Sequence, residues 1–232
     1  MVKRTSVVTV IRNNLSSNQK KFLAEVIGTF IIVVLATGSV VIDAKLNWRL
    51  GIPFLAFAPF VGVVICVYLF GKISMAHLNP AVTLGFLITK HITKRLAVLY
   101  FPAQITGALL GSLFVRYAIG SGASLGTNSP NYAYPLPLIF GVEVLASALL
   151  MAVILVVVHK KGLRGFGGIV IGGIVGFDII FLAFISGASM NPACSLAPAI
   201  VSGVLANLWL YLTATFIGTS IIATIYRKRV YK

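Results

Sequence analysis

The chain has 232 residues, of which 59% are hydrophobic and only 10% are charged, and its formal net charge is +15. A soluble domain would contain about 25% charged residues, so the composition excludes an ordinary water-soluble protein. The basic balance alone would suit a nucleic-acid-binding protein, but no basic segment is interleaved with aromatic residues. The composition therefore predicts a membrane protein without a nucleic-acid partner.

Six long apolar runs follow one another along the chain, and each has the length of a transmembrane helix. About 20 apolar residues are needed to cross a hydrocarbon core of roughly 30 Å. The pattern predicts an all-α membrane protein with six transmembrane helices, at 22–42, 52–71, 96–115, 136–158, 166–185 and 204–226. Residues 1–21 contain five basic residues and no cleavable signal pattern, so we expect a cytoplasmic N-terminal tail there.

The positive charges are distributed unevenly over this six-helix topology. With the N-terminus in the cytoplasm, 16 lysines and arginines lie on the cytoplasmic side, and only Lys45, Arg49 and Arg116 lie on the other. Cytoplasmic loops of membrane proteins carry an excess of Lys and Arg. The bias predicts an integral protein of the cytoplasmic membrane, with both termini in the cytoplasm and with membrane lipids as partners of its basic segments.

The chain divides into two similar halves. Each half begins with a helix that contains one acidic residue, Glu25 in the first and Glu143 in the second. Three helices per half give the two copies opposite orientations in the membrane, which is the inverted repeat of many transport proteins. We expect a first repeat at 22–120, an external connecting loop at 121–135, and a second repeat at 136–232 that ends in a short cytoplasmic tail.

One tripeptide occurs in both halves, as Asn79-Pro80-Ala81 and as Asn191-Pro192-Ala193. About ten apolar residues follow each copy, and ten helical residues rise about 15 Å, half of the hydrocarbon core. Proline suits the first turn of a helix, and the asparagine before it can act as the N-cap. The pattern predicts two re-entrant half-helices, one per repeat, that meet near the midplane with both asparagine amides at the junction.

The motifs around these tripeptides resemble those of the aquaporin, or major intrinsic protein, family over nearly the whole chain. The resemblance rests on residues 24–30, 73–85, 104–108 and 186–193, and the last of these segments is most similar to nodulin-intrinsic and related bacterial members. It implies an aquaporin-like fold and a homotetramer with one pore per subunit. It also implies a passive channel for water or small uncharged solutes such as glycerol, ammonia, hydrogen peroxide or a metalloid hydroxide.

The resemblance also implies roles for single residues. Glu25 and Glu143 would accept hydrogen bonds from backbone N–H groups of the two loops and hold the half-helices in place. His77, Ser186 and Gly187 would belong to the loops that line the pore. Each half-helix N-terminus carries roughly half an elementary positive charge, so the junction would exclude cations.

The selectivity filter departs from the usual pattern of the family. Members usually carry an arginine three residues after the second asparagine, where this chain has Cys194. The other filter positions match Pro59 or Phe60, Ile179, and Ala188. Such a filter would be apolar, uncharged and wider than that of a water-selective channel, and Cys194 should face the lumen and react with thiol reagents.

The remaining polar residues form no recognisable catalytic or cofactor-binding pattern. His77, His91 and His159 lack metal-ligand spacing, and Cys66 is expected to be packed inside a helix. We therefore expect neither an enzyme, nor a metal site, nor a cofactor. Asp178 lies beside Ile179, and its expected partners are Arg116 or backbone groups, although it could instead line the outer vestibule.

Two alternative functions remain open. Broken helices in inverted repeats also form coupled secondary transporters, but these need more buried carboxylates than two with a structural role. A non-conducting structural or adhesion membrane protein is the second alternative.

Overall fold

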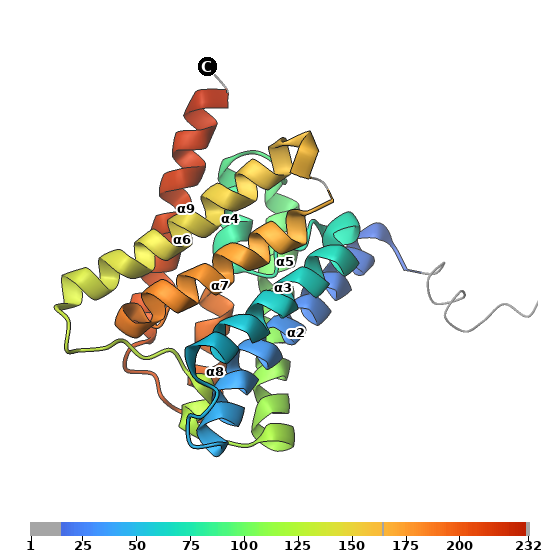
Figure 1. The fold of residues 1–232 in the computed structure, drawn as a ribbon. Helices are drawn as coiled ribbons and strands as arrows, with labels where there is room; N and C mark the ends of the chain where they lie inside the picture. The colour runs from blue at the N-terminus through green and yellow to red at the C-terminus, as the bar shows by residue number, and fades with distance from the viewer. Residues whose placement is uncertain (1–14, 164, 231–232) are drawn as a thin grey trace, which may run out of the picture.

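The computed structural model describes residues 15–163 and 165–230, and within these ranges the chain is helical and contains no strand (Figure 1). Six helices are long and apolar enough to cross a membrane, namely α2 (Ser17–Lys45), α3 (Gly51–Ser74), α5 (Lys94–Phe114), α6 (Leu136–His159), α7 (Gly167–Ser186) and α9 (Leu208–Val230). The predicted all-α fold with six transmembrane helices is therefore confirmed.

Two of these helices begin four or more residues away from their predicted starts, and the other four begin within two residues of them. The start of α2 lies inside the expected N-terminal tail, because Ser16 and Gln19 form a capping box at 2.8 and 3.3 Å. The rest of that tail, residues 1–14, lies outside the described residues. The last helix was expected from residue 204 but begins at Leu208, because the preceding helix ends at Ser202, its C-cap Gly203 has a φ of 82°, and 203–207 contain turns.

Two short helices follow the repeated tripeptides. They are α4 (Pro80–Ile88), with 9 residues, and α8 (Pro192–Ser202), with 11 residues. In both cases proline occupies the first turn, and an asparagine with extended backbone is the N-cap. Three single-turn elements complete the described chain, namely η1 (Val115–Ile119), η2 (Ala123–Gly126) and η3 (Lys161–Leu163).

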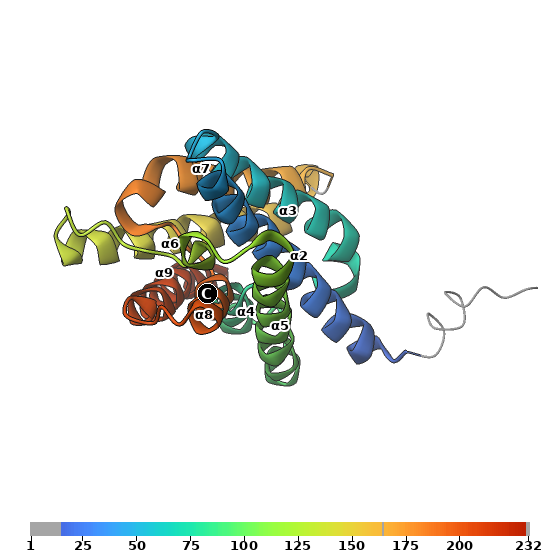
Figure 2. The ribbon, with the colours of Figure 1, turned by 90° about the horizontal axis from the view of Figure 1, so that it is seen from below.

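The helices pack in pairs that repeat between the two halves. Helix α2 packs against α3 and α5, and the corresponding α6 packs against α7 and α9. The halves meet where α3 crosses α7, and each half-helix also contacts the last long helix of the other half, α4 with α9 and α8 with α5. In Figure 2, α4 and α8 lie toward the middle of the bundle. This exchange of contacts joins the two repeats into one body.

Two glycines allow the closest helix crossings, and they occupy corresponding places in the two halves. A Cβ atom on Gly107 would lie 2.2 Å from the carbonyl oxygen of Val26, and one on Gly218 would lie 2.1 Å from that of Val144. No side chain fits in either place, so α2 approaches α5, and α6 approaches α9, at backbone contact. Close approach through small residues is typical of transmembrane helix packing.

The outer surface of the bundle is apolar. Large side chains such as Phe57, Leu69 and Phe181 are more than half exposed. Patches of this kind are rare on soluble monomers, and they suit a hydrocarbon environment. The acidic side chains lie inside the bundle instead, where Glu25, Asp43, Glu143 and Asp178 are fully buried.

Candidate functional site

A cavity of about 240 Å³ lies along the axis of the bundle. One face of α3 and one face of α7 line it at every fourth residue, as Leu55, Pro59, Val63 and Val67, and as Ile171, Val175, Ile179 and Ala183. Val158 and Ile171 mark one end of the cavity, and Leu55 and Asn128 mark the other. Twelve residues of α7 correspond to about 18 Å of helix, so the cavity covers much of a membrane thickness.

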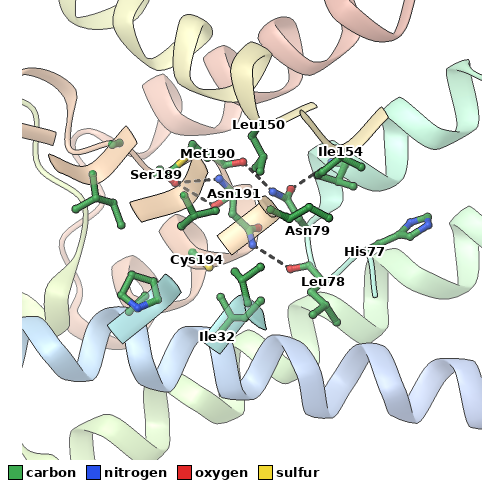
Figure 3. A pocket seen from close by; sticks show the side chains of 18 of the residues that line it. Ile32, His77, Leu78, Asn79, Leu150, Ile154, Ser189, Met190, Asn191 and Cys194 are labelled. Carbon is green, nitrogen blue, oxygen red and sulfur yellow. Dashed lines mark hydrogen bonds between the residues drawn. The ribbon is translucent and has the colours of Figure 1, made fainter. Parts of the chain in front are cut away.

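Asn79 and Asn191 meet inside this cavity (Figure 3). The side-chain oxygen of Asn79 accepts from the backbone N–H of Ala81 at 2.8 Å, and that of Asn191 accepts from Ala193 at 3.0 Å. Each asparagine therefore caps its own half-helix. The two half-helix N-termini point toward each other at the centre of the cavity.

The amide nitrogens of the two asparagines bind to opposite loops. Nδ2 of Asn79 donates to the carbonyl of Met190 at 2.8 Å, and Nδ2 of Asn191 donates to the carbonyl of Leu78 at 2.9 Å. The sequence predicted that both amides would lie at the junction, but not that each would bind the opposite loop. A primary amide has two N–H donors, so one of them holds the opposite loop, and the second remains for a molecule in the cavity.

Glu25 is fully buried on α2 and binds the first loop. Its carboxylate accepts hydrogen bonds from the backbone N–H groups of His77 at 3.0 Å and Leu78 at 2.7 Å. It also accepts from the Ser74 hydroxyl at 2.6 Å and from Nε2 of Gln104 at 2.7 Å. Four donors compensate the cost of burying this charge.

Glu143 occupies the corresponding place on α6. It accepts from the backbone N–H groups of Ser189 at 3.2 Å and Met190 at 2.8 Å, and from the Ser186 hydroxyl at 3.0 Å. A tyrosine completes each arrangement: Tyr100 donates to the Ser74 carbonyl at 2.8 Å, and Tyr211 donates to the Ser186 carbonyl at 2.6 Å. The tyrosines were not among the predicted site residues, and only the comparison of the two halves reveals their equivalence.

The two loops contain backbone conformations that need external support. Ala76 and Leu78 have φ values of 48° and 53°, and the corresponding Ala188 and Met190 have 44° and 55°. Non-glycine residues rarely adopt this left-handed region, and they persist there only when surrounding contacts fix them. The N–H groups of Leu78 and Met190 bind Glu25 and Glu143, so the buried carboxylates stabilise the strained residues directly.

The two halves differ in the polar groups beside the carboxylates. In the first half, Nε2 of Gln104 also donates to the Thr83 hydroxyl at 2.8 Å, and this hydroxyl contacts Nδ1 of His77 at 3.1 Å. In the second half, the hydroxyl of Ser195, the counterpart of Thr83, donates to Oδ1 of Asn128 at 2.9 Å. The first half-helix is thus also bound to α5 through Gln104, and the second to the segment that connects the repeats through Asn128.

Asn128 was missed as a site residue because it lies in the segment interpreted as an external connecting loop. Besides the bond from Ser195, its Nδ2 donates to the carbonyl of Gly187 at 3.1 Å, and the residue lines the cavity. The neighbouring Leu125 is buried, and Gly126 lies against Thr37 of α2. The polar Asn and Thr residues of this loop were the sequence feature that could have indicated a site residue here.

Most of the predicted filter residues lie around the same cavity. Pro59, Ile179, Ala188 and Cys194 all line it, together with the loop residues His77 and Gly187. The alternative Phe60 does not, because its ring packs against α7, where a Cβ on Gly172 would lie 3.1 Å from it. Ser186 does not line the cavity either, since its side chain binds Glu143.

The expected partners of Asp178 were wrong. Both carboxylate oxygens are buried and have no hydrogen-bond partner among the described residues. Arg116 instead donates to the carbonyl of Val201 at 2.6 Å. Asp178 is also not among the residues that line the cavity, because Val175 and Ile179 occupy the cavity face of α7.

The cysteines and histidines are placed in three different environments. Cys66 is fully buried, with its thiol 3.5 Å from the Gly28 carbonyl, whereas Cys194 is partly exposed on the cavity. Among the described residues no group of three His, Cys, Asp or Glu is arranged to hold a metal ion. His91 and His159, which are 68 residues apart in the sequence, nevertheless contact each other.

Comparisons with known proteins agree with this architecture. The family model described as "Major intrinsic protein" matches residues 13–226. The chain is 37% identical over 212 residues to glycerol uptake facilitator protein-like 6 of Lactiplantibacillus plantarum, covering 88% of this chain and 95% of that protein. It is 32% identical over 207 residues to aquaporin NIP2-2 of Zea mays, covering 89% of this chain and 70% of that protein.

A solved structure shares the fold. The X-ray structure of the aquaglyceroporin from Plasmodium falciparum superimposes with a TM-score of 0.80 at 24% sequence identity, covering 91% of this chain and 96% of that one.

Proposed function

The chain belongs to the major intrinsic protein family, and from this premise we infer that it is a passive channel for water and small uncharged solutes in a membrane. The observation that carries this function is the meeting of Asn79 and Asn191 inside one apolar cavity. The lining offers few strong binding groups, so molecules pass without being held. Because the family consists of channels, we propose no catalytic role for this chain.

The junction of the half-helices is proposed to select against ions. The second N–H of each asparagine would donate to the oxygen of a passing molecule and orient it away from its neighbours. The two facing N-termini add partial positive charge, roughly half an elementary charge each. This field repels cations, and the orientation of the central molecule interrupts a proton-conducting chain of waters.

The solutes are proposed to include molecules of the size of glycerol. Pro59, Ile179, Ala188 and Cys194 contribute no charge and no long side chain to the cavity. An arginine at position 194 would narrow this region and add hydrogen-bond donors, whereas a cysteine leaves it wider and less polar. The similarity to a protein named a glycerol uptake facilitator supports the same solute class.

The topology and assembly are also part of the proposal. We place the protein in the cytoplasmic membrane with both termini in the cytoplasm, because 16 of 19 basic residues then lie on that side, as is usual for cytoplasmic loops. A homotetramer embedded in membrane lipid is proposed from the family resemblance.

Stopped-flow measurements on proteoliposomes test the function. Wild-type protein should increase both the rate of osmotic shrinkage and the rate of glycerol entry, without proton leak. Cys194→Arg should lower glycerol entry at least fivefold and lower water flux less. Equal glycerol rates in wild type and Cys194→Arg would contradict the proposed filter, and no flux of either molecule would contradict the channel.

The two cysteines provide a matched pair for locating the lumen. A mercurial should block wild-type flux, and Cys194→Ser should remove this block because the partly exposed thiol lines the cavity. Cys66→Ser should leave the block unchanged, since Cys66 is fully buried against α2. If Cys66→Ser removed the block and Cys194→Ser left it unchanged, solutes would have to pass along another route.

Imposed gradients separate the channel from the two alternatives. A coupled secondary transporter would accumulate its solute when a proton or sodium gradient is applied, whereas a channel only equilibrates it. A non-conducting structural protein would leave every flux at the lipid background.

A further inference from the structure

Two histidines and a tyrosine from different elements meet at the end of the cavity marked by Val158 and Ile171. His91 lies in the turn after α4, His159 is the last residue of α6, and Tyr226 lies on α9. The Nε2 atoms of the two histidines are 3.2 Å apart, and the Tyr226 hydroxyl contacts Nε2 of His159. The channel function described above assigns no role to this cluster.

Hydrogen bonds on the other ring nitrogens set the tautomer of each histidine. Nδ1 of His159 lies 2.7 Å from the Leu155 carbonyl, which only accepts, so Nδ1 carries the hydrogen. Nδ1 of His91 lies 2.7 Å from the Thr89 hydroxyl oxygen, whose own hydrogen is donated to the Gly85 carbonyl at 2.9 Å. In a neutral imidazole the second nitrogen then has a lone pair. Two lone pairs therefore face each other across 3.2 Å.

The positions of the two rings match those of two ligands on one metal ion. Imidazole nitrogens about 2.0–2.1 Å from a tetrahedral zinc ion lie about 3.3 Å apart, with ring centroids about 5.2 Å apart. The corresponding distances here are 3.2 Å and 5.1 Å. A straight N–H···N bond of the same length would separate the centroids by about 5.5 Å. The Tyr226 hydroxyl has a single hydrogen, which it can donate to only one of the two Nε2 atoms.

The surroundings favour a nitrogen-binding metal. Metal-binding histidines typically donate their second N–H to a carbonyl or another oxygen, as both rings do here. Lys21 and Arg95 border a hollow that also includes His91, so charge alone would not attract a hard cation such as Mg²⁺.

We propose that His91, His159 and Tyr226 form a binding site for one divalent transition-metal ion of the zinc, nickel and copper class. Imidazole nitrogen suits these metals, whereas Mg²⁺ and Ca²⁺ prefer carboxylate and carbonyl oxygen. The two imidazoles are the ligands, and the Tyr226 hydroxyl, which contacts Nε2 of His159, lies beside them. The site joins the turn that follows one half-helix to the ends of two long helices.

Calorimetric titration of the purified full-length chain in detergent, after removal of any affinity tag, tests the site with ZnCl₂ as the probe. Wild-type protein should bind one Zn²⁺ per chain and no Mg²⁺. His91→Asn and His159→Asn should each weaken Zn²⁺ binding at least tenfold, and Tyr226→Phe should weaken it severalfold. Lys160→Asn, which places the same residue next to His159, should stay within twofold of wild type.

A second measurement needs no variant and therefore does not depend on whether the variants fold. Zn²⁺ should raise the Tm of the wild-type protein, EDTA should reverse the rise, and Mg²⁺ should have no effect. Zinc binding that survives the loss of either imidazole, or a Tm that Zn²⁺ does not change, would overturn the proposal. Neither readout involves solute flux, so the metal site and the channel function are tested separately.

Discussion

Asn79 and Asn191 hold each other's loops: each side chain donates a hydrogen bond to the carbonyl of the residue that precedes the other asparagine, Met190 and Leu78 respectively. Residues more than 110 positions apart in the sequence are thereby joined at the centre of the cavity. The same two side chains cap the half-helices. Each asparagine therefore starts its own half-helix, holds the opposite loop and offers its second N–H to a molecule in the lumen.

The first prediction concerns these asparagines. Asn79→Ala and Asn191→Ala should each lower the free energy of unfolding by about 1–3 kcal/mol, because each removes a helix cap and a buried hydrogen bond. Thermal unfolding in detergent measures the change. The double variant should be less destabilised than the sum of the two, since the sites couple through neighbouring groups; simple additivity would show that the loops are held independently.

Buried carboxylates give the second prediction. Glu25→Gln and Glu143→Gln should both lower the Tm, because a carboxamide can accept at one atom only, while its NH₂ group faces other donors. The loss should be larger for Glu25, which has four donors including Nε2 of Gln104, than for Glu143, which has three.

Gln104→Leu distinguishes the two carboxylates further. This variant removes a donor from Glu25 and should lower the Tm of the wild-type protein. It should lower the Tm much less when combined with Glu25→Gln, because the interaction is already lost there. Additive losses in the double variant would indicate that Gln104 acts through Thr83 instead.

Closely packed glycines give the third prediction. Gly107→Ala and Gly218→Ala should each destabilise the protein by about 1–3 kcal/mol, which is typical of overpacking, because the added Cβ meets a backbone oxygen. Gly173→Ala is a matched control within a transmembrane helix, since no atom lies within 4 Å of its added Cβ. Equal Tm values for all three variants would mean that these crossings can widen at little cost.

The sequence predicted the helices and the half-helices because both are determined by local properties. Apolar runs of about 20 residues and a capped proline start need no knowledge of the partner helices. The same reasoning found Glu25 and Glu143, since an acidic residue in an apolar helix must have partners. The partners from other helices were not predicted, because Gln104 reaches Glu25, and Tyr100 and Tyr211 reach the carbonyls of Ser74 and Ser186, only when the helices pack.

Three details of the site could not be read from the sequence. Pro59 and Phe60 are adjacent, and only the rotation of α3 against α7 decides which of them reaches the cavity. Asp178 was expected to find a partner, but its carboxylate is buried with no hydrogen-bond partner among the described residues. His91 and His159 showed no ligand spacing, because their proximity arises from the ends of separate elements and not from one motif.

The last prediction joins the proposed metal site to the channel. His91 packs against Phe86 with ring centroids 5.5 Å apart, His159 follows Val158, and both Phe86 and Val158 line the cavity. A metal ion held by these histidines would place its charge at the mouth and clamp the surrounding turn. Micromolar Zn²⁺ should therefore lower water flux through wild-type proteoliposomes at least twofold, and EDTA should restore it. His159→Asn should conduct normally and ignore Zn²⁺, while Lys160→Asn should remain sensitive. If Zn²⁺ lowers the flux of both variants equally, the ion acts elsewhere, for example at the lumen thiol of Cys194.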